Sequence, residues 1–382
     1  MQDVASIGAG PINKLISRLP GAIDIEAMAR ASGAFTRSRK IKTAGELLHV
    51  ALAYAAGALS LRDTAAWATL RGVALSDVAV LERLRLPAVA AWLQEVTAAI
   101  LAPRRSAEEA SGWRVRMIDA TVISSPGKAA DHRLHASYDL ASQRLVALTL
   151  SGMSESESLR HFAIGPGEIA VADRGYLKAR DLSEVRKAGG HFVVRAGWNS
   201  ARWHRADGTP FDLFAWLDGL DYGEHAQTPV TIWPERTARG AFPVRLIARR
   251  MTKSEAEKGR LRARRTASKD QRRVTPQTLK GAEFILLVTS LDAESFPAAD
   301  ILALYRRRWQ VELVFKRLKS LLGLDELPAK DPDLARTWIY AKLLAHLLAE
   351  DLTRKILDSP PCARRHRAGP FLLDLAHPEN AL

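Results

Sequence analysis

The sequence lacks the features that would place it outside a reducing cytosol or in a membrane. It contains a single cysteine, Cys362, so it can form no disulfide within the chain and no zinc site built on cysteine. One cysteine is what we expect of a protein that works in a reducing cytosol. No run of about 18 apolar residues occurs, so no membrane span is expected. Glycine, proline and charged residues interrupt the opening residues, which argues against a signal peptide.

Acidic residues are in short supply relative to basic ones. The chain has 56 Lys and Arg against 42 Asp and Glu, a formal net charge of +14. Two stretches hold most of this excess: residues 249–273 contain eleven basic and three acidic residues, and residues 305–319 contain six basic residues and one acidic. A basic surface attracts polyanions, either nucleic acid or an acidic membrane face. Because the excess is local, it favours a binding surface over a general bias in composition.

The first hundred residues are rich in Ala and Leu, and residues 1–105 are predicted to be helical. Within them, residues 61–86 form two short amphipathic stretches joined by a turn that contains glycine, with Ser76 as a predicted N-cap. This pattern suits a helix-turn-helix, and it suits two packed helices of any bundle equally well.

From Trp113 onward the pattern changes to alternating strands and helices, which indicates an α/β fold. One predicted strand runs through Asp119, and the apolar segment EIAVAD is a second strand that ends at Asp173. The alternation occupies residues 112–197, stops over residues 198–280, and resumes in residues 281–358. The interruption contains strand-like pieces and the basic stretch, so we expect an insertion there. Residues 359–382 are expected to be a disordered tail.

A long helix is predicted from about Ala298 to Leu322, ended by Gly323. At about 100° per residue, four polar side chains fall on one stripe roughly 60° wide: Tyr305, Arg308, Glu312 and Lys319. The apolar stripe of the same helix comprises Val311, Phe315, Leu318 and Leu322. The polar row therefore lies along one margin of the buried face, where a helix meets a groove. A solvated face would place its charges opposite the core.

Tyr305, Arg308, Glu312 and Lys319, with gaps of two, three and six residues, reproduce the Y-R-E-K signature of a group of bacterial insertion-sequence transposases of the DDE class. Met117-Ile-Asp-Ala-Thr resembles the strand that bears the first catalytic Asp of that family, and Ala172-Asp-Arg-Gly-Tyr resembles the segment that bears the second. The resemblance covers roughly residues 40 to 350. It implies a ribonuclease-H-like catalytic core interrupted by a β-rich insertion, with a helical N-terminal DNA-binding region.

The resemblance makes Asp119, Asp173 and Glu312 the expected catalytic residues and metal ligands. Three carboxylates that converge need a counter-charge, and hard cations prefer carboxylate oxygen. We expect two Mg²⁺ ions, with Mn²⁺ able to substitute, one activating water or a 3′-hydroxyl and the other stabilising the departing oxygen.

Basic and hydroxyl side chains around these carboxylates and in the basic stretch are candidate contacts to DNA phosphates. They are Tyr305, Arg308, Lys319, Arg174, Arg260, Arg262, Arg264 and Arg265. A solvated charged helix is the alternative interpretation of the stretch that contains the last four.

The expected function is cut-and-paste transposition: the enzyme cuts double-stranded DNA at the terminal repeats and transfers 3′-hydroxyl ends into target DNA. The resemblance implies a hairpin intermediate on the transposon end and a homodimer that holds two ends together. Two alternatives remain open, a metal-dependent nuclease on the same fold and an inactive derivative that only binds DNA and represses.

Two weaker features also carry alternatives. Asp131, His132 and His135 could form a second metal site, but a polar loop or a substrate contact is the preferred interpretation. Four tryptophans of the insertion could stack on an unpaired base, but core packing is the commoner fate of this side chain. They are Trp198, Trp203, Trp216 and Trp233.

Overall fold

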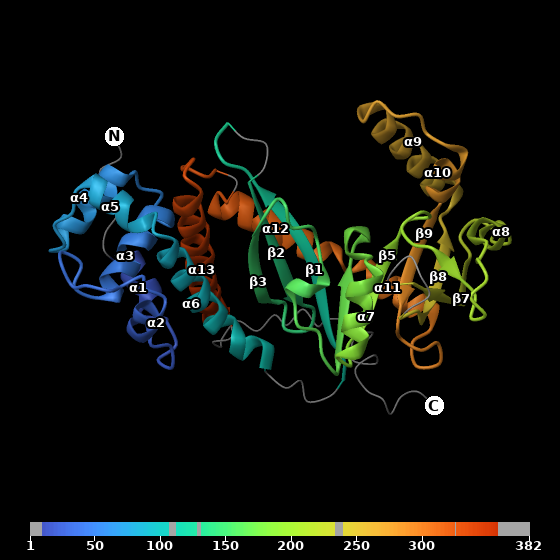
Figure 1. Cartoon of the computed structure of the whole chain (residues 1–382), viewed down its shortest axis with the longest axis horizontal. Helices are drawn as coiled ribbons and strands as arrows, with labels where there is room; N and C mark the ends of the chain where they lie inside the picture. The colour runs from blue at the N-terminus through green and yellow to red at the C-terminus, as the bar shows by residue number, and fades with distance from the viewer. Residues whose placement is uncertain (1–9, 107–111, 128–130, 234–239, 325, 358–382) are drawn as a thin grey trace.

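A computed structural model describes residues 10–106, 112–127, 131–233, 240–324 and 326–357. Helices from the first hundred residues gather at one end of an elongated molecule, and a sheet runs through its middle (Figure 1). Near the other end, helices α9 and α10 project away from the sheet. The predicted tail, residues 359–382, lies outside the described residues.

In the described part of the chain, six helices precede the sheet, and polar N-caps mark several of their starts. Thr43, Ser60 and Ser76 each accept a hydrogen bond from the backbone N–H three residues further on. The cap at Ser76 is the one that the sequence predicts, and α4 and α5 supply the helical pair expected within residues 61–86. A DNA-binding role for this pair stays a prediction. The helices are α1 (Gly10–Ile16), α2 (Ile25–Ala31), α3 (Ala44–Ala55), α4 (Leu61–Leu70), α5 (Asp77–Leu84) and α6 (Pro87–Ser106).

One mixed sheet of nine strands organises the rest of the chain, in the order β3-β2-β1-β4-β5-β9-β8-β7-β6. β1, β4 and β5 are parallel to one another, and the other neighbours are antiparallel. The strands are β1 (Arg114–Ile123), β2 (His132–Asp139), β3 (Arg144–Gly152), β4 (Glu168–Ala172), β5 (His191–Ala196), β6 (Trp203–His204), β7 (His225–Ile232), β8 (Phe242–Arg250) and β9 (Phe284–Thr289). This mixed α/β architecture agrees with the predicted fold class.

The central strands are buried on both faces, so alternate residues enter two different cores. Met117, Val171 and Val193 belong to one hydrophobic cluster, which also contains residues of α6, α12 and α13. The residues that follow each of them belong to the other cluster, on the face covered by α7 (Ala179–Lys187). The same alternation places Asp119 and Asp173 on the face of α12, each two residues beyond a side chain of the first cluster.

The segment between β5 and β9 contains both strands and helices. β6, β7 and β8 extend the sheet, but the longest element of the segment is helix α9 (Lys253–Lys269), which has 17 residues. Thr252 and Glu255 form a capping box at its start, and this explains why the basic stretch folds as a helix. The description "β-rich" therefore fits only part of this segment. Its other helices are α8 (Leu213–Asp218) and α10 (Pro276–Gly281).

The prediction of a single helix from Ala298 to Leu322 is wrong, because the chain forms two helices over this range. α11 (Ala298–Arg306) and α12 (Trp309–Leu322) are separated by Arg307 and Arg308. The backbone N–H groups of these two residues bond to the carbonyls three residues back, a 3₁₀ pattern that replaces the α-helical one. No proline or glycine marks this break in the sequence. Gly323 ends α12 in the left-handed conformation, as predicted.

Helix α13 (Pro332–Leu357) contacts both the N-terminal helices and the sheet. It packs against α6 and α3, and the Tyr340 hydroxyl accepts a hydrogen bond from the backbone N–H of Leu150 in β3. The N-terminal helices are thus attached to the sheet through α13 and α6. Among the described residues, no single helix has the length and apolar character to cross a membrane, although the bent pair Asp77–Leu84 and Pro87–Arg104 passes that test together.

Candidate active site

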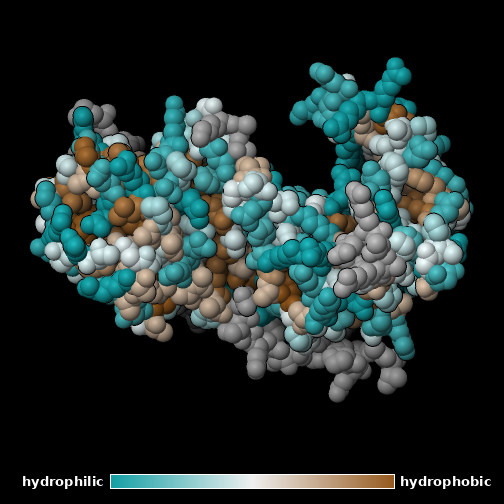
Figure 2. Space-filling view, viewed as in Figure 1, coloured by the Kyte–Doolittle hydropathy of each residue, from teal (hydrophilic) through white to brown (hydrophobic). Residues whose placement is uncertain are grey.

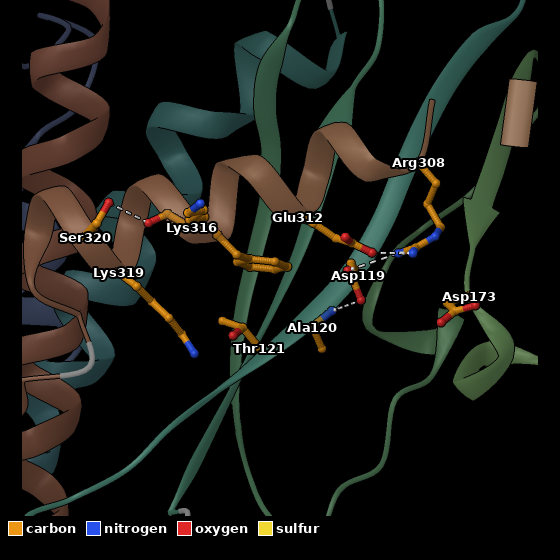
Figure 3. Close-up of a pocket in the computed structure, with 10 residues that line it drawn as sticks. Asp119, Ala120, Thr121, Asp173, Arg308, Glu312, Lys316, Lys319 and Ser320 are labelled. Atoms are coloured by element: carbon orange, nitrogen blue, oxygen red, sulfur yellow. Dashed lines mark hydrogen bonds and ion pairs between the residues drawn. The ribbon is translucent and has the colours of Figure 1, made fainter. Parts of the chain in front are cut away.

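Three acidic side chains from three separate elements face one cavity of about 610 Å³ (Figure 3). Asp119 lies on β1, Asp173 follows the last residue of β4, and Glu312 lies in the first turn of α12. The two aspartates come together because β1 and β4 are parallel neighbours, with Ile118 opposite Ala172. Glu312 joins them because α12 packs on β1 and β2.

Two side chains from the junction of α11 and α12 hold these carboxylates. Arg308 donates from Nη1 to Oδ2 of Asp119 at 3.2 Å and from Nη2 to Oε1 of Glu312. The Tyr305 hydroxyl donates to Oδ1 of Asp173 at 2.9 Å. The 3₁₀ break gives Tyr305 and Arg308 their positions relative to Glu312. All three carboxylates are therefore bonded to groups of the Y-R-E-K signature.

Burial and local charge set the two aspartates apart. Burial raises the pKa of Asp119 to about 6, and the opposing effects of the Ala120 N–H and Arg308 do not cancel it. Burial also acts on Asp173, but the Arg174 N–H, Arg308 and Tyr305 outweigh it and lower the pKa of that carboxyl. The site thus stabilises the ionised form of Asp173 and disfavours the ionised form of Asp119.

Lys319 lines the same cavity, as its place in the signature predicts, and so does Lys316. Both lysines lie on α12, further along the helix than Glu312. In Figure 3 they lie on one side of Asp119 and Glu312, and Asp173 lies on the other side. Sequence reasoning missed Lys316, although it follows Glu312 by four residues and therefore lies one helical turn away on the same face. The cavity thus has a cationic side formed by α12.

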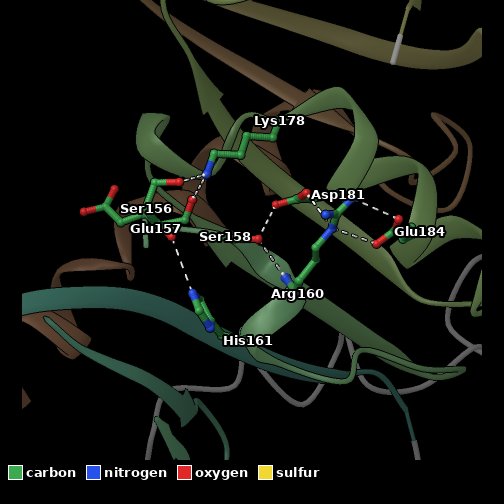
Figure 4. Close-up of polar contacts among 8 residues, drawn as sticks. All are labelled: Ser156, Glu157, Ser158, Arg160, His161, Lys178, Asp181 and Glu184. Carbon is green, nitrogen blue, oxygen red and sulfur yellow. Dashed lines mark hydrogen bonds and ion pairs between the residues drawn. The ribbon is translucent and has the colours of Figure 1, made fainter. Parts of the chain in front are cut away.

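The segment after Asp173 is shaped by its glycine. A Cβ at Gly175 would lie 1.7 Å from Oε2 of Glu157, so a larger residue could not follow Arg174 without displacing that carboxylate. Lys178 bonds to the Glu157 carbonyl and to Ser156, and Arg160 bonds to Asp181 and Glu184 on α7 (Figure 4). These contacts fix residues 156–161 behind the Asp173 segment. Arg174 itself is exposed beside the site, and its contact with DNA stays a prediction.

The four arginines predicted from the basic stretch all lie on α9 and do not line the cavity. Arg262, Arg264 and Arg265 are exposed. Arg260 differs from them, because its Nη1 bonds to Oε1 of Glu283. The structure therefore brings Tyr305, Arg308 and Lys319 to the carboxylates and leaves the α9 arginines on a separate surface.

The donor set suits divalent cations in kind, since three carboxylates facing one cavity offer the oxygen ligands that hard cations prefer. As arranged, however, no group of three or more His, Cys, Asp or Glu side chains in the described residues converges closely enough to hold a metal ion. Arg308 lies between Asp119 and Glu312, and Tyr305 bonds to Asp173. Cation binding between Asp119 and Glu312 therefore requires the Arg308 contacts to open.

The structure shows where the histidines of the possible second metal site lie. His132 and His135 lie in β2, so the expectation of a polar loop is wrong for both of them. His135 bonds to Ser151 and stacks on His161, and burial lowers its pKa to about 3, so it is a neutral core residue.

The four tryptophans between β5 and β9 pack within their own segment. Trp203 is buried, Trp198 and Trp216 contact the second cluster, and Trp233 stacks on His204.

Arg195 is the second residue near the site that sequence reasoning missed. It lies near the carboxyl end of β5, and its charge helps to lower the pKa of Asp173. The signal that could have found it is the rule that the carboxyl ends of neighbouring parallel strands meet at one edge of a sheet. Applying that rule requires the strand order, which the sequence alone does not supply.

Comparison with known proteins gives close and distant likenesses. The model of the transposase DDE domain family matches residues 111–348. The InsL protein of insertion sequence element IS186A from Escherichia coli (strain K12) is 40% identical over 347 residues, which cover 88% of this chain and 92% of that protein. The transposase for insertion sequence element IS421 from Escherichia coli is 40% identical over 348 residues, with the same coverage. The transposase for insertion sequence element IS231F from Bacillus thuringiensis subsp. israelensis is 22% identical over 279 residues, covering 64% of this chain and 57% of that protein.

Proposed function

The chain belongs to the family of DDE-domain transposases of insertion sequences, and from this premise we propose that it cuts DNA at the two ends of such an element and joins the freed 3′-hydroxyl ends to target DNA. The observation that carries the proposal is the cavity onto which Asp119, Asp173 and Glu312 all face, from two strands and a helix. The family implies a ribonuclease-H-like core around these residues, and the mixed sheet is compatible with one.

Transposases of this family use divalent metal ions. We propose that Asp119, Asp173 and Glu312 hold two Mg²⁺ ions, which Mn²⁺ can replace. Bound there, such ions activate an attacking oxygen and stabilise a departing one. Arg308 bonds to Asp119 and Glu312, so its guanidinium moves aside when cations bind and becomes available to a phosphate oxygen. Tyr305 keeps Asp173 in position through its hydroxyl.

The lysines of α12 hold the DNA strand next to the cut. Lys316 and Lys319 line the cavity as point charges and would bind phosphates on that side of the carboxylates. The helical region of residues 1–105 and the exposed arginines of α9 would bind double-stranded DNA further from the cut, through its phosphates. We also propose a homodimer that holds two element ends together, acting in the bacterial cytoplasm.

The test uses purified protein, a labelled duplex of the terminal inverted repeat that flanks the gene, and Mg²⁺. We expect a cut at the element end that requires the divalent cation and that Glu312→Gln abolishes. Glu294→Gln is the matched control, because it makes the same change in an exposed side chain before α11. Cutting in EDTA, or unchanged cutting by Glu312→Gln, would overturn the proposal.

Two rival functions are separated by adding a supercoiled target plasmid. A transposase joins the labelled 3′-end to the plasmid, whereas a nuclease on the same fold cuts and leaves the plasmid unlabelled. An inactive DNA-binding derivative binds the duplex and gives neither product under any cation. Joined product is the result we expect.

A further inference from the structure

A row of charged side chains crosses three neighbouring parallel strands, within β1 and near the carboxyl ends of β4 and β5. β1 pairs with β4 so that Ile118 lies opposite Ala172, and β4 pairs with β5 so that Ala172 lies opposite Val194. Extending both registers by one residue sets Asp119 beside Asp173 and Asp173 beside Arg195. Asp173 has an extended backbone, so the extension is geometrically sound. Neighbouring strands lie about 4.8 Å apart, and residues in register share a face.

Arg195 is the cationic member of this row, and its side chain has no partner of its own. It is exposed, and it makes no hydrogen bond or ion pair with any residue that the structure describes. Arg308, by contrast, is mostly buried and bonds to two carboxylates. The charge of Arg195 still reaches the site: it adds to the backbone N–H of Arg174, Arg308 and Tyr305 in lowering the pKa of Asp173, and it opposes the rise in pKa that burial causes at Tyr305.

A second cation lies at the same end of β5. Arg174 lies against Gly197, where an added Cβ would be 3.0 Å from its Cδ. Gly197 follows Arg195 by two residues, so Arg174 and Arg195 flank the β5 end of the row. Lys316 and Lys319 lie beyond the opposite end, on α12 (Figure 3). The carboxylates are thus bordered by cations on both sides.

We propose that Arg195 binds a backbone phosphate of the DNA strand that is cut, on the side of the cut opposite to Lys319. This inference rests on the proposed function, which it deepens by assigning a phosphate contact to β5. A strand crossing the carboxylates meets Lys319 on one side and Arg195 on the other, with the scissile phosphate between them. The planar guanidinium can bind two phosphate oxygens at once, and its exposure leaves both edges accessible.

The rival explanation is that Arg195 serves only as a counter-charge for Asp173. A counter-ion would lie within 4 Å of the carboxylate, yet no ion pair joins these two described residues, while Tyr305 bonds to Asp173 directly. A solvated arginine beside a carboxylate that already has a partner adds little to its position. A phosphate supplies the charge that this guanidinium does not find within the described residues.

The test maps individual phosphates. Terminal-repeat duplexes, each with one neutral methylphosphonate linkage at a different position around the cut, are titrated with protein in EDTA so that no cutting occurs. For the unmodified duplex, we expect Arg195→Gln to weaken binding roughly 10- to 100-fold. On the β5 side of the cut, one neutral linkage should weaken binding by the natural protein more than the others do. Arg195→Gln should bind the duplex with that linkage as tightly as it binds the unmodified duplex. Lys319→Gln should become insensitive to a different linkage, on the other side of the cut.

The outcomes separate this inference from the proposed function. If Arg195→Gln binds like the natural protein, or stays sensitive to every linkage, the phosphate contact is wrong. If only the pH profile of cutting shifts, Arg195 acts on Asp173 alone and the inference again fails. Arg195→Lys, which keeps the charge and loses the fork, should recover part of the affinity and guards against a folding defect. A natural protein that binds but never cuts would overturn the proposed function and leave the contact to be judged by the linkage map.

Discussion

The cavity at the strand ends and the projecting helix α9 both carry concentrated charge, but they hold it differently. In the cavity, Arg308 and Asp119 are largely buried and bonded to each other, with side-chain exposures of 13% for Arg308 and 18% for Asp119. On α9, Arg262, Arg264 and Arg265 are exposed, and together with α10 the helix projects from the body across a hollow (Figure 2). Buried, paired charges fix geometry, whereas exposed charges contribute attraction that salt screens.

This difference predicts how each region responds to mutation. Removing one charge from the cavity should disable a step or leave a partner uncompensated, so effects should be large and specific. Removing one charge from α9 should weaken binding by a small amount that adds to the others. The predictions below test this division from the largest effect to the smallest.

The largest effect is expected at Asp119. Asp119→Asn should lower the rate of cutting at least about 10³-fold, because an amide cannot supply the negative oxygen that holds a cation against the reacting phosphate. Binding of the terminal duplex in EDTA should not weaken, since the carboxylate that is removed repels phosphate. Single-turnover cutting and fluorescence anisotropy measure the two quantities. A variant that loses binding and cutting in parallel would mean that the cavity acts only through affinity.

A large effect on stability is expected at Arg308. In the natural protein the pKa of Asp119 is raised to about 6, so its ionisation lowers stability as the pH rises toward 6. Arg308→Met removes the nearest positive charge and should lower the free energy of unfolding by about 1–3 kcal/mol at pH 7.5. At pH 4.5, where Asp119 is protonated, the loss should be smaller.

Urea denaturation at the two pH values checks this prediction in metal-free protein. Glu312 contributes less to the effect, because 53% of its side chain is exposed and water can replace Arg308 there. An equal loss at both pH values would mean that Arg308 stabilises the fold by packing and that its pairing with Asp119 is incidental.

The sequence predicts those features of the fold and the site that depend on residues close together along the chain. Asp119, Asp173 and Glu312 were predicted because short motifs surround each of them, and the strands bearing the aspartates lie where the hydrophobic pattern puts them. The helical fold of the basic stretch was also accessible, since Thr252 followed three residues later by Glu255 is a capping-box pattern. A charged helix is one of the two interpretations that the sequence leaves open for this stretch, and the capping-box pattern favours it.

Other features depend on contacts that no local pattern records. The row through Arg195 depends on the pairing of β4 with β5, and the two strands are separated by α7. The break between α11 and α12 contains no helix-breaking residue; it follows from where Tyr305 and Arg308 find their carboxylate partners. Functional sites are where local preference and tertiary contact are expected to disagree.

A moderate effect is expected when two α9 arginines are replaced together. Arg264→Gln with Arg265→Gln should reduce the slope of log affinity against log salt by about 2, and should weaken duplex binding roughly tenfold at low salt. Cutting at saturating protein should be unchanged, because neither residue lines the cavity. Arg180→Gln with Lys187→Gln is the matched control, since both residues are exposed on α7, which covers the face of the sheet opposite to α12. An equal change in slope for the control pair would remove α9 from the DNA interface.

The smallest effect separates two arginines of the same helix. Arg264 is exposed and makes no hydrogen bond or ion pair with the part of the chain that the structure describes, whereas Arg260 bonds to Glu283, the residue just before β9. Arg264→Gln should therefore reduce the salt slope by about 0.9 and leave the melting temperature unchanged. Arg260→Gln should do the reverse, lowering the melting temperature because Glu283 is buried and loses a partner, while the slope stays near that of the natural protein. If Arg260→Gln reduces the slope as much as Arg264→Gln does, then a paired arginine also binds phosphate, and the division between paired and free charge does not hold on α9.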